Sequence, residues 1–203
     1  LPDWGGVWTL RRAAPGSTPP APPPRPALKG EYLARYEAWA KEVRENAGLV
    51  RRETSNCMPP GMPGMMGTAQ YPIEFLFTPG RVSMHHEAWM QWRTIFTDGR
   101  GHPDDWDPGI FGHSIGHWEG DTLVVDTIHL KEATITNNGL NHSEKVRVTE
   151  RFRLSADGKK LLATQAFEDP EMLLNKGVRF ITWNRVEGDH VHAYDCDPSF
   201  AEN

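Results

Sequence analysis

Several features that would point to common functions are missing or scarce in this chain. Its 203 residues include two cysteines, and 22 basic residues are outnumbered by 27 acidic ones, which gives a formal net charge of −5. Because no run of lysine or arginine opposes this acidic balance, nucleic acid is not expected as the main partner. No apolar stretch approaches the roughly 18 residues of a membrane-spanning helix, so no transmembrane segment is expected. The chain also lacks the motif of an organic cofactor, and none is predicted.

Length and composition predict one domain preceded by an arm. A chain of this length can bury one sizeable core but not two. Residues 1–28 are expected to form a short strand, Trp4 to Leu10, followed by an extended segment over residues 15–26 that holds too much proline for a helix or a central strand. Residues 29–203 are expected to form a single β-barrel domain.

One segment has the periodicity of a helix. Tyr32, Tyr36 and Trp39 recur at helical spacing between residues 29 and 46, and charged side chains occupy the other positions. We therefore expect a helix over residues 29–46 whose aromatic stripe faces the core.

From residue 73 onward the pattern changes to short strands separated by turns. Turn pairs such as Pro79-Gly80, Asp98-Gly99 and Asp157-Gly158 separate many of them. Regular spacing with tight turns favours antiparallel hairpins, and alternating strand and helix units are absent. The sequence thus predicts a mainly β fold, an antiparallel, up-and-down, lipocalin-like (calycin-type) barrel with one long N-terminal helix. The expected strands cover residues 73–77, 81–87, 89–97, 112–118, 122–130, 144–154, 160–167, 177–186 and 190–194.

Cys57 and Cys196 leave two interpretations open. In an oxidising compartment they would form a disulfide between the loop after the helix and the C-terminal strand; otherwise they are two buried thiols. The chain begins at Leu1 without an initiator methionine, which a removed leader or a trimmed terminus explains equally. A removed leader and a disulfide together predict an exported, periplasmic protein.

Strand alternation assigns polar side chains to the barrel wall. Glu150 shares a strand face with apolar residues, which predicts that its carboxylate points inward. A buried carboxylate needs a cation or serves in acid/base chemistry, and Arg93 is the natural cation. The register of Asp126 stays open: it either joins Glu150 inside the barrel or faces outward.

The most informative segment is residues 112–126. Its first five residues, Gly112-His113-Ser114-Ile115-Gly116, match the G-x-S-x-G pattern of a serine-hydrolase nucleophile elbow. An elbow needs a helix after the serine, whereas Trp118-Glu119-Gly120-Asp121 predicts a hairpin. A serine hydrolase using Ser114 is therefore kept only as an alternative.

The histidines give no tight metal-binding spacing. His113 and His117 share a strand face but lie about 13 Å apart if extended, too far to bind one ion. His190 and His192 would lie about 6.7 Å apart on a strand and could share one. No metal is predicted in the main interpretation, and a histidine-dependent metalloenzyme is kept as an alternative.

Three loops are candidates for contacts at a barrel mouth. Residues 57–67 contain four methionines, including Met65, and either pack over the mouth, line an apolar ligand site or hold copper(I). Residues 98–108, which carry His102, have the charge and aromatic content of a lid or mouth loop, although their acidic residues could equally form a solvated rim. Residues 137–144 end in His142 and Glu144, two further possible ligand contacts.

Part of the chain resembles a known family. The segment Gly112–Thr127 (GHSIGHWEGDTLVVDT), with Thr97–Pro103 (TDGRGHP) before it, is similar to a family of uncharacterised exported bacterial proteins. Further matches are Pro59–Pro63, His142–Glu144 and Glu150–Phe152. The resemblance implies export, since members carry signal peptides, but it implies no reaction. His85-His86 departs from the family pattern, where an aromatic or acidic pair is expected.

These observations predict a small-molecule-binding β-barrel that is an acid/base enzyme of the lyase, isomerase or hydratase type, acting on an apolar or aromatic molecule. His113 or His117 would be the general base or acid, and Glu150 or Asp126 the second or orienting acid. The predicted substrate contacts are Arg93, Trp92, His102, His142, Trp118 and Met65. A non-catalytic carrier or sensor is a further alternative, and the oligomeric state is not predicted.

Overall fold

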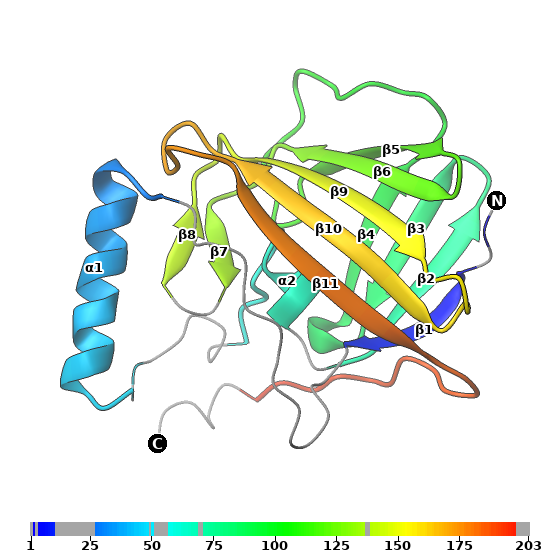
Figure 1. The fold of residues 1–203 in the computed structure, drawn as a ribbon, viewed down its shortest axis with the longest axis horizontal. Coiled ribbons are helices and arrows are strands. Elements are labelled where there is room, and N and C mark those ends of the chain that lie inside the picture. The colour runs from blue at the N-terminus through cyan, green and yellow to red at the C-terminus, as the bar shows by residue number, and fades with distance from the viewer. Residues whose placement is uncertain are drawn as a thin grey trace.

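The computed structural model shows a mainly β fold built around a closed barrel (Figure 1). It describes residues 2, 4–10, 27–48, 50, 57–68, 71–136 and 139–197. The nine strands of the barrel follow the order β1-β11-β10-β9-β6-β5-β4-β3-β2, and β2 pairs with β1 to close the ring. The proline-rich arm expected over residues 15–26 lies outside the described residues.

Most of the expected strands are confirmed to within a few residues. The barrel strands are β1 (Gly6–Leu10), β2 (Ile73–Thr78), β3 (Arg81–His86), β4 (Gln91–Phe96), β5 (His113–Glu119), β6 (Thr122–Ile128), β9 (Arg147–Leu154), β10 (Lys160–Glu168) and β11 (Gly177–Val186). A separate hairpin, β7 (Ala133–Thr136) and β8 (Leu140–His142), was not expected. The prediction of a strand over residues 190–194 is wrong, because residues 189–197 follow β11 as a tail without strand pairing.

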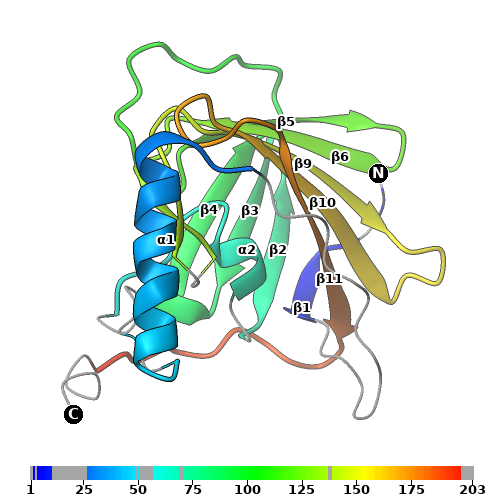
Figure 2. The ribbon, with the colours of Figure 1, turned by 60° about the vertical axis from the view of Figure 1, so that its left-hand side comes forward.

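One strand pair departs from the up-and-down expectation. β4 and β5 run parallel, with Ile95 opposite Ser114 and Phe96 opposite Ile115, whereas the other neighbouring pairs of the described barrel are antiparallel. A tight hairpin cannot join parallel strands. The connection over residues 97–112 therefore has to be long, and Figures 1 and 2 show it arching outside the barrel above β5.

The helix α1 (Gly30–Glu45) packs beside the barrel rather than on its wall (Figures 1 and 2). Tyr32 is its one buried residue. Trp39 instead packs against Gly139 at the β7–β8 turn, where an added Cβ would lie 2.5 Å from the indole. The expectation that the aromatic stripe faces the core therefore holds for Tyr32, which is buried in it, and for Tyr36, which packs partly buried against it, but not for Trp39.

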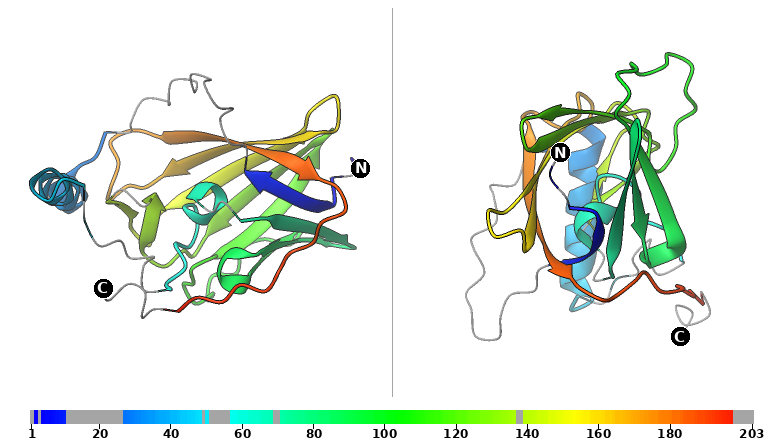
Figure 3. Two further views of the ribbon diagram at one scale, coloured as in Figure 1. Left: turned by 90° about the horizontal axis from the view of Figure 1, so that it is seen from below. Right: turned by 90° about the vertical axis from the view of Figure 1, so that its right-hand side faces the viewer.

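The barrel interior is filled by two groups of side chains. An aromatic group surrounds Trp4, whose ring centroid lies 5.2 Å from Phe75, 5.8 Å from Trp118 and 6.0 Å from Phe152. The other group comes from the methionine-rich loop and from α2 (Met65–Thr68), whose ribbon lies among the barrel strands in Figure 3. Met62, Met65 and Met66 are buried. Of the interpretations open for this loop, the structure supports packing into the barrel.

A disulfide joins Cys57 to Cys196, with a Cα–Cα distance of 5.8 Å and a sequence separation of 139 residues. It ties the loop before α2 to the tail that follows β11. The alternative of two free thiols is therefore wrong. No helix in the described ranges is both long and apolar enough to cross a membrane.

Candidate functional site

A buried ion pair lies inside the barrel, as strand alternation predicts. β4 places Arg93 and β9 places Glu150 on the inner face, and each is 1% exposed. The Arg93 guanidinium donates to Glu150 Oε2, to Thr127 Oγ1 at 3.0 Å and to Ser114 Oγ at 3.2 Å. Isolated buried charges are costly, and this pairing with added hydrogen bonds offsets part of the cost.

The other oxygen of Glu150 is satisfied as well. Gln165 Nε2 donates to Glu150 Oε1 at 3.0 Å, and Arg179 Nη2 donates to Gln165 Oε1 at 2.6 Å. Burial lowers the pKa of Arg179 to about 10, so its guanidinium stays charged at neutral pH. Both Glu150 oxygens therefore accept hydrogen bonds inside a packed core. The network links side chains of β4, β9, β10 and β11, which gives it a structural role.

Ser114 belongs to the same interior network. It is 1% exposed, and its Oγ lies 2.8 Å from Thr127 Oγ1 besides accepting from Arg93. The chain after Ser114 continues along β5 into the hairpin with β6, as expected from the Trp118–Asp121 turn. A catalytic serine must be accessible and hydrogen-bonded to a general base. Ser114 is buried and bonded to Arg93 and Thr127, so the structure gives the serine-hydrolase alternative no support.

The predicted catalytic histidines lie on the opposite face of the barrel wall. Ser114 points inward, so His113 and His117, on the alternate positions of β5, point outward. Asp126 on β6 also points outward, while its neighbour Val125 points inward and pairs with Glu150. The four residues predicted as catalytic therefore do not converge, since the barrel wall separates Glu150 from the other three.

His102, from the loop over residues 97–112, connects two of the outward residues. Its Nδ1 lies 2.8 Å from His113 Nδ1, and its Nε2 lies 3.2 Å from Asp126 Oδ2. Arg147, on β9, holds the same carboxylate with two donors: Nε to Oδ1 at 2.7 Å and Nη2 to Oδ2 at 2.6 Å. Asp126, His102 and His113 thus form a hydrogen-bonded series whose acidic end is fixed by Arg147.

The ionised carboxylate of Asp126 determines which nitrogen of His102 donates to it. Burial alone would raise the pKa of Asp126, but the hydrogen bonds and charge of Arg147, with help from His102, outweigh it and lower that pKa. The carboxylate can then only accept, so His102 donates to it from Nε2. When both imidazoles are neutral, His102 accepts at Nδ1 and His113 donates from Nδ1, and this assignment leaves His113 Nε2 without a proton.

The environment of His113 favours the neutral imidazole that this assignment requires. Burial, followed by the nearby His102, His129 and Arg100, lowers the pKa of His113. Its ring stacks on Phe96 with centroids 5.2 Å apart, and Trp106 meets it edge-on at 4.6 Å. An unprotonated imidazole nitrogen between two aromatic side chains is a suitable general base.

The loop over residues 97–112 is fixed above this series. His129 Nε2 lies 2.9 Å from the carbonyl oxygen of Pro103, and Arg100 lies over the Phe96 ring, with its Cζ 4.0 Å from the ring centroid. The loop covers the outer face of β5, whereas the sequence suggested a lid at the barrel mouth. Trp106 closes over His113 yet is itself 42% exposed.

A groove of about 620 Å³ lies on the outer face beside this series. Its floor has small and apolar residues, and its rim has charged ones from β5, β6, β9, β10 and the loop. The residues that line it are Gly99, Arg100, Ile115, Gly116, His117, Val124, Asp126, Arg147, Thr149 and Glu168. A second depression of about 490 Å³ adjoins it, since Arg147 and Glu168 line both.

The other predicted substrate contacts lie away from this groove. Trp92 is outward but stacks on His85 with ring centroids 4.1 Å apart, and Trp118 points into the aromatic core. His142 is buried, with Nε2 2.8 Å from the carbonyl oxygen of Met62. Met65 belongs to the buried α2 group, and Arg93 to the inner ion pair. These five were predicted to contact one substrate, but the alternation of strand faces and the packing of α2 distribute them over the core and the surface.

Several groove residues were missed by the sequence reasoning. Arg147 and Thr149 lie on the same strand as Glu150, at the alternate positions that must face outward when Glu150 faces inward. Strand alternation places them on the outer face, but nothing in the strand pattern marks either of them as a site residue. Arg100 and Glu168 carry no comparable signal, because their positions depend on the loop and on the end of β10.

His86, on β3, is a buried histidine without a partner among the described residues. It is 1% exposed, and neither ring nitrogen has a hydrogen-bond partner. Burial, with the charge of Arg93 and His85 nearby, lowers the pKa of His86 to about 3. The folded protein therefore keeps this imidazole neutral well below its usual pKa.

Between pH 7 and pH 4.5, the free energy of unfolding of the wild type is expected to fall by about 2.5 kcal/mol more than that of the His86→Leu variant. The unfolded chain binds a proton as the pH falls through about 6.5, whereas folded His86 stays neutral until about pH 3. Buried His86 therefore does not lower the free energy of unfolding above pH 6.5, and the loss grows as the pH falls from 6.5 towards 3. Urea denaturation at several pH values measures it, with the exposed His117→Gln as control. Parallel losses in wild type and His86→Leu would contradict the assignment.

The fold and the site together define a closed β-barrel with a polar, histidine-containing groove on its outer wall. Comparison with protein-family models finds no match for the chain, and a search of curated proteins finds none either.

Proposed function

We propose that this protein binds a small molecule in the outer groove and acts on it as an acid/base enzyme. The observation that carries the proposal is the hydrogen-bonded series Asp126–His102–His113. With both imidazoles neutral, this series leaves an unprotonated nitrogen on His113. The groove beside it is about 620 Å³, a volume within the range of small-molecule sites. The proposal moves the site from the barrel interior, where the sequence suggested a cavity, to the outer face.

The lining of the groove supports a ligand with an apolar or aromatic part and at least one polar group. Ile115 and Val124 offer an apolar floor, against which such a part would lose contact with water. Arg147 and His117 stand at the rim with exposed side chains that can hydrogen-bond polar groups. Trp106 packs on His113, and the aromatic part of a substrate would replace this indole.

In the proposed chemistry His113 Nε2 accepts a proton from the substrate. As the imidazole becomes cationic, its Nδ1–H remains bonded to His102, and the Asp126 carboxylate at the far end stabilises the positive charge. The same proton is then returned to another atom of the substrate or to the leaving group. Lyase, isomerase and hydratase reactions need no more than such transfers.

One observation favours a second candidate, a non-catalytic carrier that uses the same groove. His113 is 2% exposed beneath the loop, so a ligand on the groove floor contacts Asp126 and Arg147 without reaching His113. A carrier binds its ligand and returns it unchanged. The two candidate functions use the same groove. They differ in whether the ligand displaces the Trp106 indole and so reaches His113.

We also propose that the protein is exported. The Cys57–Cys196 disulfide supports this, because disulfides persist mainly in oxidising compartments such as the periplasm. The resemblance of residues 57–152 to exported bacterial proteins points the same way and stays a prediction.

Screening aromatic and aliphatic hydroxy acids and keto acids for binding and turnover tests the proposed site. We expect Asp126→Asn and His102→Gln to lower turnover of any substrate found about 100-fold or more, the usual contribution of general acid/base catalysis. Glu119→Gln is the matched control, because Glu119 is also an outward acid paired with a histidine, His117, but does not line the groove. Binding without turnover, weakened by Asp126→Asn, would establish the carrier instead. Turnover that survives both variants would contradict the acid/base proposal.

A further inference from the structure

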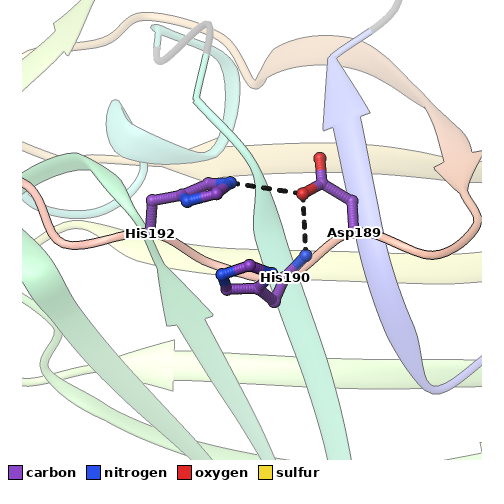
Figure 4. Close-up of side chains that lie close together, drawn as sticks. All are labelled: Asp189, His190 and His192. Atoms are coloured by element: carbon purple, nitrogen blue, oxygen red, sulfur yellow. Dashed lines mark hydrogen bonds and ion pairs between the residues drawn. The ribbon is translucent and has the colours of Figure 1, made fainter.

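Three side chains that follow β11 lie close together at the surface. Asp189, His190 and His192 each offer one ligand atom, and these atoms lie within 4.8 Å of one another (Figure 4). Asp189 Oδ1 is 3.2 Å from His192 Nε2, and the centroids of the two imidazole rings are 4.3 Å apart. The sequence suggested this histidine pair on a strand; the segment has no strand pairing, yet its side chains converge.

The backbone that carries these side chains is held against the barrel. The backbone N–H of His192 donates to Glu87 Oε2 at 2.8 Å, and Glu87 is itself buried. Four residues further on, the disulfide fixes Cys196. On the other side the segment starts directly from β11 through the turn at Gly188, whose φ is 73°. Because both sides are fixed, much of the entropy cost of assembling three ligands is already met in the folded chain.

The distances suit a tetrahedral ion. Zinc–nitrogen and zinc–oxygen bonds of about 2.0–2.2 Å place neighbouring ligand atoms about 3.3–3.6 Å apart. The Asp189–His192 pair already has nearly this spacing. All three side chains are exposed, so rotation about their side-chain bonds can bring the remaining atoms to it without moving the backbone.

We propose that Asp189, His190 and His192 bind a divalent transition-metal ion of the zinc type. Two imidazole nitrogens and one carboxylate oxygen form a donor set that suits Zn²⁺, Ni²⁺ or Cu²⁺, whereas Mg²⁺ and Ca²⁺ take oxygen ligands. Three protein ligands leave a fourth tetrahedral position for water or for a donor from another molecule. The tail runs along the side of the barrel opposite the loop over residues 97–112 (Figures 1 and 3), so this site is independent of the outer groove.

Calorimetric titration of the full chain, with any affinity tag removed, tests the site with zinc chloride and with magnesium chloride. We expect one zinc per chain, and no heat of binding from magnesium. Asp189→Asn and His192→Gln are each expected to weaken zinc binding by about tenfold or more, and the two substitutions with His190→Gln together to abolish it. His117→Gln is the matched control, since this exposed imidazole also lies 3.2 Å from an acid, Glu119, and we expect it to leave zinc binding unchanged.

Two results would overturn the proposal. One is the absence of zinc binding by the wild type; the other is equal binding by the wild type and by the triple variant. The thermal melting of each variant is recorded in parallel, and because the three side chains are exposed, we expect unchanged melting temperatures without metal. Since the substitutions lie outside the groove, small-molecule binding there should not respond to them.

Discussion

Glu150→Gln is expected to lower the free energy of unfolding by about 3–5 kcal/mol. The substitution keeps the size of the side chain but removes the negative charge beside Arg93, whose guanidinium is fully buried. An uncompensated buried charge is costly because the protein interior cannot replace the hydration that it loses. Urea denaturation of the purified variant at neutral pH measures the effect.

A double variant separates the cost of a broken pair from the net contribution of the pair. Arg93→Met combined with Glu150→Leu removes both charges, and we expect it to recover most of the stability that Glu150→Gln loses. The inner ion pair would then be a structural element that apolar side chains can replace. If Glu150→Gln unfolded at the same urea concentration as the wild type, the buried pair would not have the role assigned to it.

Replacing both Cys57 and Cys196 by alanine is expected to cost about 5 kcal/mol of unfolding free energy, at the upper end of the usual range. The cost is large because the two cysteines are 139 residues apart, so the bridge constrains most of the unfolded chain. Urea denaturation of the double variant against the oxidised wild type measures it.

Two results bear on this estimate. The wild type treated with a thiol reductant should unfold at the same urea concentration as the double variant, since both lack the bridge. A loss below about 1 kcal/mol in both would show that the disulfide does not constrain the unfolded chain as the loop length requires.

Strand alternation predicted the inner half of the barrel wall well. Glu150 lies between Val148 and Phe152 on the apolar face of its strand and points inward as predicted, and Arg93, predicted as the cation that an inward acid needs, points inward as well. Asp126 could not be assigned because both faces of β6 are apolar enough to face a core: Val124 is nearly as buried as Leu123. The outer face is covered by the loop over residues 97–112, and strand patterns carry no information about such a cover.

The candidate site depends on this loop and was therefore not predictable as a unit. His102 reaches His113 only because the parallel pairing of β4 and β5 carries residues 97–112 across the outside of the barrel. Turn signals in the sequence favoured hairpins, which would have made all pairs antiparallel. The path of a long connection between strands depends on tertiary packing, so the residues within it do not by themselves predict which strands it joins.

The tail after β11 shows the same limit. Residues 190–194 alternate in a strand-like pattern, but β11 is already paired with β10 on one edge and β1 on the other. A closed barrel offers no free edge at that point, so the tail cannot add a strand. Closure of the ring is a property of the whole chain that local patterns do not contain.

The most direct test of the account is the position of a bound small molecule relative to the barrel wall. Protein labelled at its methyl groups and at its histidine rings reports on both faces by NMR, through the methyl groups of Ile115 and Val124 outside and of Ile95 and Val125 inside. With a ligand from the screen, we expect the signals of Ile115 and Val124 and the imidazole signals of His102 and His113 to shift, while those of Ile95 and Val125 stay nearly unchanged. Shifts confined to the inner residues would contradict the account and return the site to the barrel interior.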